Sequence, residues 1–355
     1  MSLLARADEF CRRFDLRVPV LLAPMAGSSA PSLSIAVMNA GGLGACGAVS
    51  MRPDEMIAWA ADVRAHASGP FQINTWIPDP PPARDAEHES RVRQFLARFG
   101  PPVPPEAGDA VRADFDAQCE AMLEIAPPMV SSVMGIFPPA FVARLEERRI
   151  TWLANVSTVA EARLAETAGA DVIVAQGSEA GGHRGAFDAA DGERAAIGLV
   201  SLVPAIVDAV KAPVVATGGI ADARGVVAAL ALGASAVQIG TAFLRCPEAK
   251  TPRAWADAIG RAAPEDTILT RAFSGRAGRS LANGYAREAA SREAPRPAPY
   301  PVQRGLTGPM RAAAVKEDDV DRMQAWAGQS AALARDEPAA DVVRRIWEGA
   351  RAMLA

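Results

Sequence analysis

The residue best suited to proton transfer lies in a glycine-rich segment. Residues 177–185 read GSEAGGHRG, where four glycines surround His183, one of only three histidines in the chain. Glycine removes side-chain bulk, so the backbone can approach a bound molecule closely. An unperturbed imidazole has a pKa of about 6.5 and exchanges a proton near neutral pH. We predict that His183 is a catalytic base; the alternative is a surface-loop histidine without a function.

The charged neighbours of this histidine, and the other two histidines, give weaker signals. We expect Glu179 to anchor the loop rather than to act as a second base. Arg184 could help to hold an anionic substrate, although a solvated loop arginine is the commoner case. We assign no function to His66, in a helix tail, or to His88, in a charged segment.

Glycines and a threonine follow two later apolar runs. The segments TGGI (217–220) and QIGT (238–241) would offer backbone N–H groups and a hydroxyl. Loops after neighbouring strands of a barrel often hold a phosphate, helped by a helix N-terminus. Tight turns alone would also explain one glycine pair. Two pairs at the two expected positions favour a phosphate site.

The remaining polar residues expected at this edge are mostly neutral amides, such as Asn74 and Gln176. Amides can pair with the polar edge of an isoalloxazine ring, so a phosphate site with amide walls suits flavin mononucleotide, FMN. Either amide could instead satisfy buried polar groups of the barrel. Because the carboxylate and histidine ligands of a metal hydrolase are missing, we predict no metal site.

To lie close together, these residues need a fold that brings the ends of several strands to one side. Short apolar runs alternate with helical patterns, which predicts a parallel sheet covered by helices. Eight such units favour a closed (β/α)8 TIM barrel, whose active sites lie at the carboxyl ends of the strands. The eight runs are 18–25, 42–49, 70–76, 128–135, 150–156, 170–177, 212–219 and 235–241.

The spacing of these runs predicts two domains. Residues 1–250, together with about 331–355, are expected to form the barrel, to which a last helix at about 339–353 returns. Residues from about 251 to 330 are expected to form a small, mainly helical appended domain. A proline-rich insert at 78–109 follows the third predicted strand.

Composition excludes several kinds of protein. The chain has 355 residues, a formal net charge of −4 and no lysine and arginine cluster, so we expect no nucleic-acid partner. The four cysteines are far apart in the sequence, and no long apolar run or signal-type segment is present. We therefore expect a cytoplasmic protein without disulfides or membrane contact. The oligomeric state stays open, a homodimer included.

Segments spread over nearly the whole chain form a recognisable combination. They are APMAG (23–27), QIN (72–74), QGSEAGGHRG (176–185), ATGGI (216–220), QIGTAFL (238–244), TRAFSGRAGRSLANG (270–284), YPVQRGLTGPMRAAA (300–314) and WAGQ (326–329). Together they resemble the FMN-dependent nitronate monooxygenases, formerly called 2-nitropropane dioxygenases. No single segment would be specific enough.

The resemblance implies an activity and a set of site residues. Alkyl nitronates, with propionate 3-nitronate as the usual substrate, would be oxidised with O₂ to a carbonyl compound and nitrite, which implies a role in detoxification. His183 would be the base. The residues expected to contact FMN are Met25, Asn74, Gln176, Gly181, Gly218, Gly219, Gln238, Ile239, Gly240 and Thr241.

One segment departs from the family pattern. The fourth strand reads VSSVMG, with Ser132 and Val133 where the family often has an aromatic and a larger polar residue. Substrate contacts from this strand are therefore not carried over.

Three other functions stay open. A flavin-dependent enoyl-acyl-carrier-protein reductase shares an EAGGH-type loop but would need NAD(P)H. A flavin-free phosphate-binding barrel such as an aldolase would need a lysine on a barrel strand, and Lys211, Lys250 and Lys316 are badly placed for that. A non-catalytic FMN-binding barrel would be yellow but indifferent to nitronates.

Overall fold

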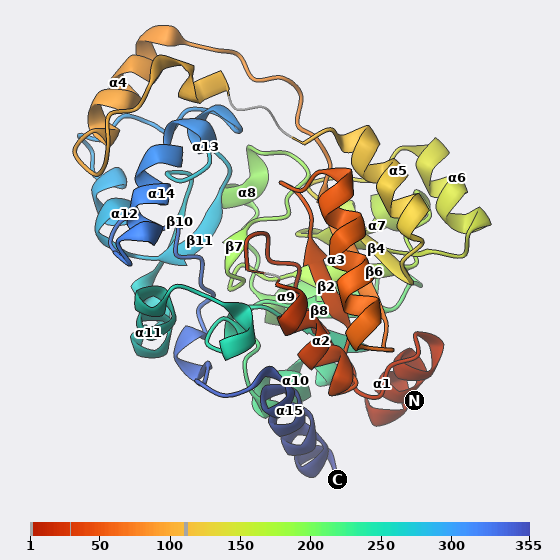
Figure 1. Ribbon diagram of the computed structural model, residues 1–355. Coiled ribbons are helices and arrows are strands. Elements are labelled where there is room, and N and C mark those ends of the chain that lie inside the picture. The colour runs from red at the N-terminus through yellow and green to blue at the C-terminus, as the bar shows by residue number, and fades with distance from the viewer. Residues whose placement is uncertain (1–2, 29, 110–112) are drawn as a thin grey trace.

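Eight parallel strands form the centre of the molecule (Figure 1). The computed structural model describes residues 3–28, 30–109 and 113–355. In spatial order the strands are β1 (Val20–Leu22), β9 (Ala236–Ile239), β8 (Val214–Thr217), β6 (Val172–Gln176), β5 (Thr151–Val156), β4 (Met129–Val133), β3 (Phe71–Trp76) and β2 (Gly44–Gly47). Each lies within one of the eight predicted runs.

The sheet closes on itself between its two ends. A bridge joins Leu21 of β1 to Leu43, just before β2. The Leu43 N–H donates to the Val20 carbonyl at 3.1 Å, and the Leu22 N–H donates to the Leu43 carbonyl at 2.9 Å. The prediction of a (β/α)8 TIM barrel is confirmed.

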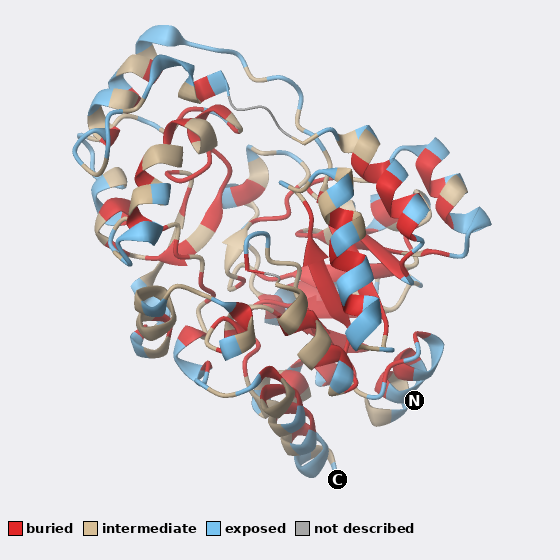
Figure 2. Cartoon of the chain, in the orientation of Figure 1, coloured by how far each residue is buried: buried red, intermediate tan, exposed pale blue. Residues whose placement is uncertain are grey.

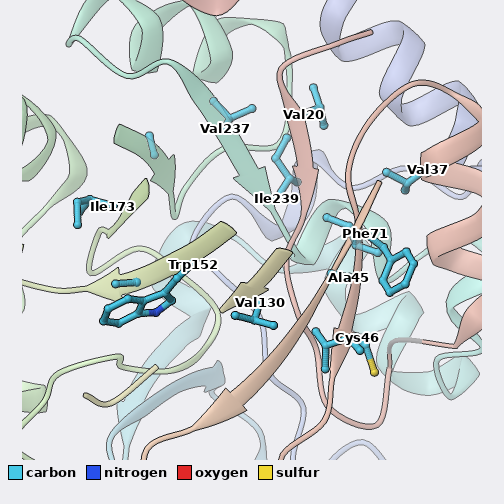
Figure 3. Packing of buried hydrophobic residues seen from close by; sticks show 14 of the residues in the cluster. Val20, Val37, Ala45, Cys46, Phe71, Val130, Trp152, Ile173, Val237 and Ile239 are labelled. Carbon is cyan, nitrogen blue, oxygen red and sulfur yellow. The ribbon is translucent and has the colours of Figure 1, made fainter. Parts of the chain in front are cut away.

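The strands are buried on both faces, which explains their continuous apolar sequences (Figure 2). In β6, Val172 and Val174 point into the barrel interior, where they join a small apolar cluster. Ile173 and Ala175 point outward into the larger cluster under the helices, part of which Figure 3 shows. Successive residues of one strand thus fill two different cores.

Helices cover the outside of the barrel. They are α2 (Pro31–Asn39), α3 (Pro53–His66), α5 (Phe115–Ile125), α6 (Pro139–Glu147), α7 (Val159–Thr167), α9 (Leu199–Val207), α10 (Ala223–Ala231) and α15 (Ala339–Leu354). The last of these comes back from the end of the chain and packs on α10 and α2. Helix α1 (Leu3–Arg13) contributes Phe10 and Cys11 to the interior cluster.

A second apolar core lies beside the barrel and draws on two distant parts of the chain. Helix α4 (Ala86–Leu96), from the insert after β3, lies next to α13 (Val302–Leu306), as Figure 1 shows. The buried residues of this core include Val92, Leu96, Phe273, Tyr285, Leu306 and Met310. We call this part the side lobe; it also holds α11 (Arg253–Arg261), α12 (Gly284–Ala289) and α14 (Gly308–Lys316).

The side lobe contains strands that the helical prediction for 251–330 missed. Strands β10 (Thr267–Thr270) and β11 (Gly278–Leu281) form an antiparallel pair. A third strand, β7 (Gly182–His183), comes from the loop after β6, and its His183 pairs with Gly278 of β11. Strand β11 reads GRSL, which lacks the β-branched and aromatic residues that mark a strand.

Short elements complete the chain: η1 (Pro105–Asp109), α8 (Asp191–Arg194), η2 (Thr241–Phe243), η3 (Pro247–Ala249), η4 (Pro264–Asp266) and η5 (Ala331–Leu333). The four cysteines are free and buried. In the described part of the chain, no helix is long and apolar enough to cross a membrane. Nor do three histidine, cysteine or carboxylate side chains gather there as a metal site requires.

Candidate active site

The His183 imidazole lies between two tryptophans where the barrel meets the side lobe. Its ring centroid is 4.7 Å from that of Trp76, the last residue of β3. The centroid of Trp326, in the segment after α14, is 4.9 Å away on an edge-to-face geometry. His183 is partly buried, and both indoles limit the access of water to its imidazole.

Ser274 fixes the orientation of this imidazole. Its hydroxyl oxygen lies 2.8 Å from His183 Nε2, and Ser274 is fully buried. The same hydroxyl donates to the Arg276 carbonyl at 3.2 Å. A hydroxyl has only one proton to donate, so when it donates to this carbonyl it accepts from Nε2–H, and in the other tautomer it donates to Nε2. The first arrangement leaves the lone pair on Nδ1 to take up a proton.

The surroundings of His183 lower its pKa to about 3. Loss of hydration is the largest cause, followed by the positive charges of Arg304, Arg276 and Arg311. The expectation of an unshifted pKa near neutrality is therefore wrong. The imidazole is therefore neutral at pH 7, which is the form a base needs, and negative charge beside it would favour its protonation.

Polar side chains at the end of β6 hold the histidine loop. Gln176 donates through Nε2 to the His183 carbonyl at 3.0 Å and accepts from the Gly185 N–H at 2.8 Å. The Glu179 carboxylate accepts from the Leu199 N–H at 2.9 and 3.1 Å, at the start of α9. Glu179 is thus the expected loop anchor. The flavin contact of Gln176 stays a prediction.

The expectation that Arg184 faces the substrate or the solvent is wrong. Its side chain is buried, and Nη1 donates to the Gly177 carbonyl at 2.6 Å and to the Gln176 carbonyl at 3.3 Å. Burial lowers its pKa to about 10. Arg184 therefore holds the turn after β6 from the inside.

The glycine turns after β8 and β9 leave backbone donors unused. Gly218 and Gly219 adopt positive φ angles of 116° and 67°, which side chains rarely tolerate. The N–H groups of Gly219, Gly240 and Thr241 donate to no acceptor in the described part of the chain. Such donors at the carboxyl ends of strands suit an anion such as a phosphate.

The segment 326–330 ties these turns to the histidine loop, a connection that the sequence did not reveal. The Gly328 N–H donates to Thr241 Oγ1 at 3.0 Å, and Ser330 Oγ donates to the Gly219 carbonyl at 2.5 Å. A Cβ on Gly181 would lie 2.5 Å from the Gly328 nitrogen. Gly181 is therefore required for this packing, and its flavin contact stays a prediction.

The amides expected to meet the flavin are buried at the barrel mouth. Asn74 Nδ2 donates to Ser131 Oγ at 3.0 Å, while Asn74 Oδ1 accepts from no described residue. Gln238 Oε1 accepts from Gln72 Nε2 at 3.2 Å. Ile239 turns its side chain into the cluster under the helices, so only its backbone could reach a ligand.

Open space borders two of the turns, and a methionine borders a third. Apart from the two neighbours in the chain, no atom of the described residues lies within 4 Å of the position that a Cβ would take on Gly27 or on Gly182. The Met25 sulfur lies 3.3 Å from the corresponding position on Gly240. Flat surroundings of this kind fit a planar ring.

A cavity of about 320 Å³ adjoins the site and has the size of a small-ligand pocket. Trp76 lines it and also contacts His183, and Tyr300 lies 5.5 Å from Trp76 between ring centroids. Met134, directly after β4, also lines the cavity. Ser132 of β4 does not line it; this residue is buried and accepts from Trp152 Nε1 at 3.0 Å.

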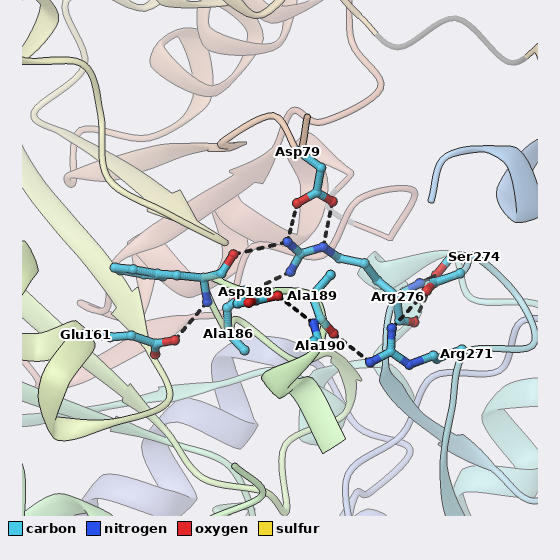
Figure 4. Close-up of polar contacts among 11 residues, drawn as sticks. Asp79, Glu161, Ala186, Asp188, Ala189, Ala190, Arg271, Ser274 and Arg276 are labelled. Atoms are coloured by element: carbon cyan, nitrogen blue, oxygen red, sulfur yellow. Dashed lines mark hydrogen bonds and ion pairs between the residues drawn. The ribbon is translucent and has the colours of Figure 1, made fainter. Parts of the chain in front are cut away.

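A buried ion pair joins three segments around the site (Figure 4). Arg276 of the side lobe pairs with Asp79 of the insert after β3, with Nε 2.8 Å from Oδ2. Its Nη1 also donates to the Ala186 carbonyl, in the histidine loop, at 2.8 Å. No sequence spacing connects these residues, although TRAFSGR is part of the family resemblance.

The fold is a TIM barrel, and its side lobe holds the His183 imidazole at the carboxyl ends of the strands. Comparison with known proteins gives the family: the nitronate monooxygenase pattern matches residues 10–349, and the chain belongs to this family of flavoenzymes.

Relatives and solved structures agree. The chain is 39% identical over 349 residues to nitronate monooxygenase of Pseudomonas aeruginosa, covering 97% of this chain and 99% of that protein. It is 39% identical over 335 residues to nitronate monooxygenase of Paraburkholderia phytofirmans, covering 92% of this chain and 91% of that protein. Nitroalkane oxidase from Streptomyces ansochromogenes superposes with a TM-score of 0.87 at 36% identity, covering 97% of this chain and 100% of that one. FabK from Thermotoga maritima superposes with a TM-score of 0.75 at 28% identity, covering 98% of this chain and 96% of that one.

Proposed function

We propose that this protein is an FMN-dependent nitronate monooxygenase. It would oxidise alkyl nitronates, propionate 3-nitronate among them, with O₂ to a carbonyl compound and nitrite, and so remove a toxic compound. The observation that carries the proposal is a neutral imidazole held at the mouth of the barrel, joined through one segment to unused backbone donors. Family membership supports it.

The residues at the mouth fit FMN. The unused N–H groups of Gly219, Gly240 and Thr241 suit its phosphate, and Asn74 Oδ1 can accept from a ring N–H. The open space at Gly27 and Gly182 leaves room for a planar ring. The residues proposed to hold FMN are Met25, Asn74, Gln176, Gly181, Gly218, Gly219, Gln238, Ile239, Gly240 and Thr241.

The protein would act on the substrate through His183. A bound flavin supplies the oxidising power and the reaction with O₂. Nδ1 of His183 would take a proton from the carbon next to the nitro group of a neutral nitroalkane, while Ser274 holds the ring through Nε2. The nitronate formed is an anion and would stabilise the protonated imidazole. A preformed nitronate needs no such proton transfer.

Spectroscopy and oxygen uptake test the proposal. The purified protein is expected to be yellow, to release FMN on denaturation, and to consume O₂ and form nitrite with propionate 3-nitronate in the absence of NADH. Rapid bleaching of the flavin by NADH, without turnover of nitronate, would instead assign the protein to the enoyl reductases. A yellow protein inert to both would be a non-catalytic flavin carrier.

A further inference from the structure

Asn155 of β5 carries an amide without a hydrogen-bond partner at the end of the barrel. Its Oδ1 is buried and accepts from no described residue, and its Nδ2 donates to none. Asparagine is depleted in strands, and a buried polar atom without a partner destabilises a fold. Folding stability therefore does not explain why an asparagine stands here.

The register of the strands turns Asn155 into the barrel. Asn155 pairs with Val174 of β6, and Leu153 precedes it by two residues in β5. Val174 and Leu153 both belong to the apolar cluster of the interior, so Asn155 faces the interior as well. These two neighbours are at most 2% exposed, whereas Asn155 is only partly buried. Asn155 is the last but one residue of β5, so a ligand reaches it from the carboxyl ends of the strands.

One end of the Asn155 amide lies against the histidine loop. A Cβ on Gly185 would overlap with Asn155 Oδ1, so this approach requires glycine. The Gly185 N–H does not serve Oδ1, because it donates to Gln176 Oε1 at 2.8 Å. The other end of the amide, Nδ2, is neither enclosed nor paired within the described part of the chain. It is therefore open to a molecule at the barrel mouth.

The two amides already proposed to meet the flavin are partly used by the protein. Gln176 spends both ends of its amide on the histidine loop. Asn74 donates through Nδ2 to Ser131 Oγ at 3.0 Å and keeps Oδ1 free. A free acceptor on Asn74 and a free donor on Asn155 match the edge of an isoalloxazine ring, where two carbonyl oxygens flank an N–H. Among the described residues, Asn155 does not line the cavity beside Trp76, so this amide belongs with the flavin site.

We propose that Asn155 Nδ2 donates a hydrogen bond to a carbonyl oxygen of the flavin ring. The inference rests on the proposed function, and it adds a residue that holds the ring beside the histidine loop. The ring carbonyl oxygens carry more negative charge when the flavin is reduced, so the bond is stronger in that state. Asn155 therefore favours reduced over oxidised flavin and raises the reduction potential.

Asn155→Leu tests this bond, because leucine has a similar branched shape but no donor. The Kd of FMN for the full-length chain is measured from the quenching of flavin fluorescence and is expected to rise about 10-fold. Binding of reduced FMN should weaken by about a further 10-fold. This second factor corresponds to a fall of about 30 mV in the two-electron midpoint potential.

Thermal unfolding separates a contact with flavin from a structural role. Without FMN, Asn155→Leu should melt at the same temperature as the wild type or higher, because leucine removes a buried polar atom that has no partner. With excess FMN, the rise in Tm should be smaller than for the wild type. A lower Tm without FMN, together with an unchanged Kd, would assign Asn155 to the fold and overturn the proposal.

Two further variants complete the comparison. Thr151 begins β5 at the opposite end of the same strand, so Thr151→Val is the matched control and should change neither the Kd nor the potential. Asn155→Asp keeps the shape of the side chain but replaces the donor by a carboxylate. It should lower the potential further than Asn155→Leu does, because its charge repels the reduced ring.

The failure of this inference can be told from the failure of the proposed function. If the wild type binds FMN but does not oxidise nitronates, the proposed function fails, and the Kd and the potential still decide the role of Asn155. An unchanged Kd and potential in Asn155→Leu overturn the inference. A raised KM for nitronate in that case would show that the amide contacts the substrate instead. A wild type without affinity for FMN overturns both.

Discussion

Ser274→Ala tests whether the side lobe sets the protonation pattern of His183. The change removes the 2.8 Å bond to Nε2 and the bonds at 3.2 and 3.3 Å to the Arg276 backbone. A buried group left without its hydrogen bond costs about 1–3 kcal/mol. Without Ser274, the proton can occupy Nδ1 instead of Nε2, and the ring can turn. We expect a loss of about 10- to 100-fold in kcat/KM with neutral nitroalkanes, because 1.4 kcal/mol corresponds to tenfold.

Comparing a neutral nitroalkane with its nitronate separates a loss of proton transfer from a general loss of activity. Preformed nitronates need no proton transfer to Nδ1, so their kcat/KM should change less than about threefold. Ser34→Ala is the matched control: Ser34 is equally buried and bonds the Ala45 backbone at 2.9 and 3.1 Å, between α2 and the outer face of β2. It should lower Tm without changing either activity. Equal losses on nitroalkane and nitronate for Ser274→Ala, or no loss on either, would refute the reasoning.

Three further changes have defined outcomes. The pKa of His183 is about 3 in the folded protein and ordinary, about 6.5, after unfolding, so the unfolded chain binds the extra proton. The free energy of unfolding should therefore fall by up to about 1.4 kcal/mol per pH unit below pH 6, and by less in His183→Asn. Urea unfolding at pH 7 and pH 5 measures this change, and the same change with pH in both proteins would contradict the reasoning. Gly219→Ala places a Cβ on a residue with φ of 67°, 3.2 Å from the Glu179 Cβ, and should reduce the ratio of bound flavin to protein; full occupancy would exclude the turn from the flavin site. Asp79→Asn leaves the buried Arg276 charge uncompensated and should lower the free energy of unfolding by about 3 kcal/mol. An unchanged Tm would show that this ion pair contributes little to stability.

The frame of the site could be predicted because its signals are local. Apolar runs such as 170–177 and 212–219 are strands because both their faces are buried. The glycines at 218 and 219 mark a turn because only glycine adopts those positive φ angles easily. Each signal lies within a few residues, and the repetition of the unit predicts the closed barrel.

The environment of His183 could not be predicted in the same way. Its partners Trp76, Ser274 and Trp326 are far apart in the sequence and meet only in the folded chain. Its lowered pKa comes first from loss of hydration and then from the charges of Arg304, Arg276 and Arg311, whose approach no spacing reveals. The same limit explains Arg184, which a glycine-rich loop led us to place outside, although tertiary packing buries it.

The most direct test of the account compares His183→Asn with the wild type, both loaded with flavin. Oxygen uptake is measured with a neutral nitroalkane and with its preformed nitronate. If His183 is the base at this site, nitroalkane turnover falls by at least about 100-fold, while nitronate turnover is largely retained. A variant that holds flavin and still oxidises the nitroalkane at the wild-type rate would contradict the account.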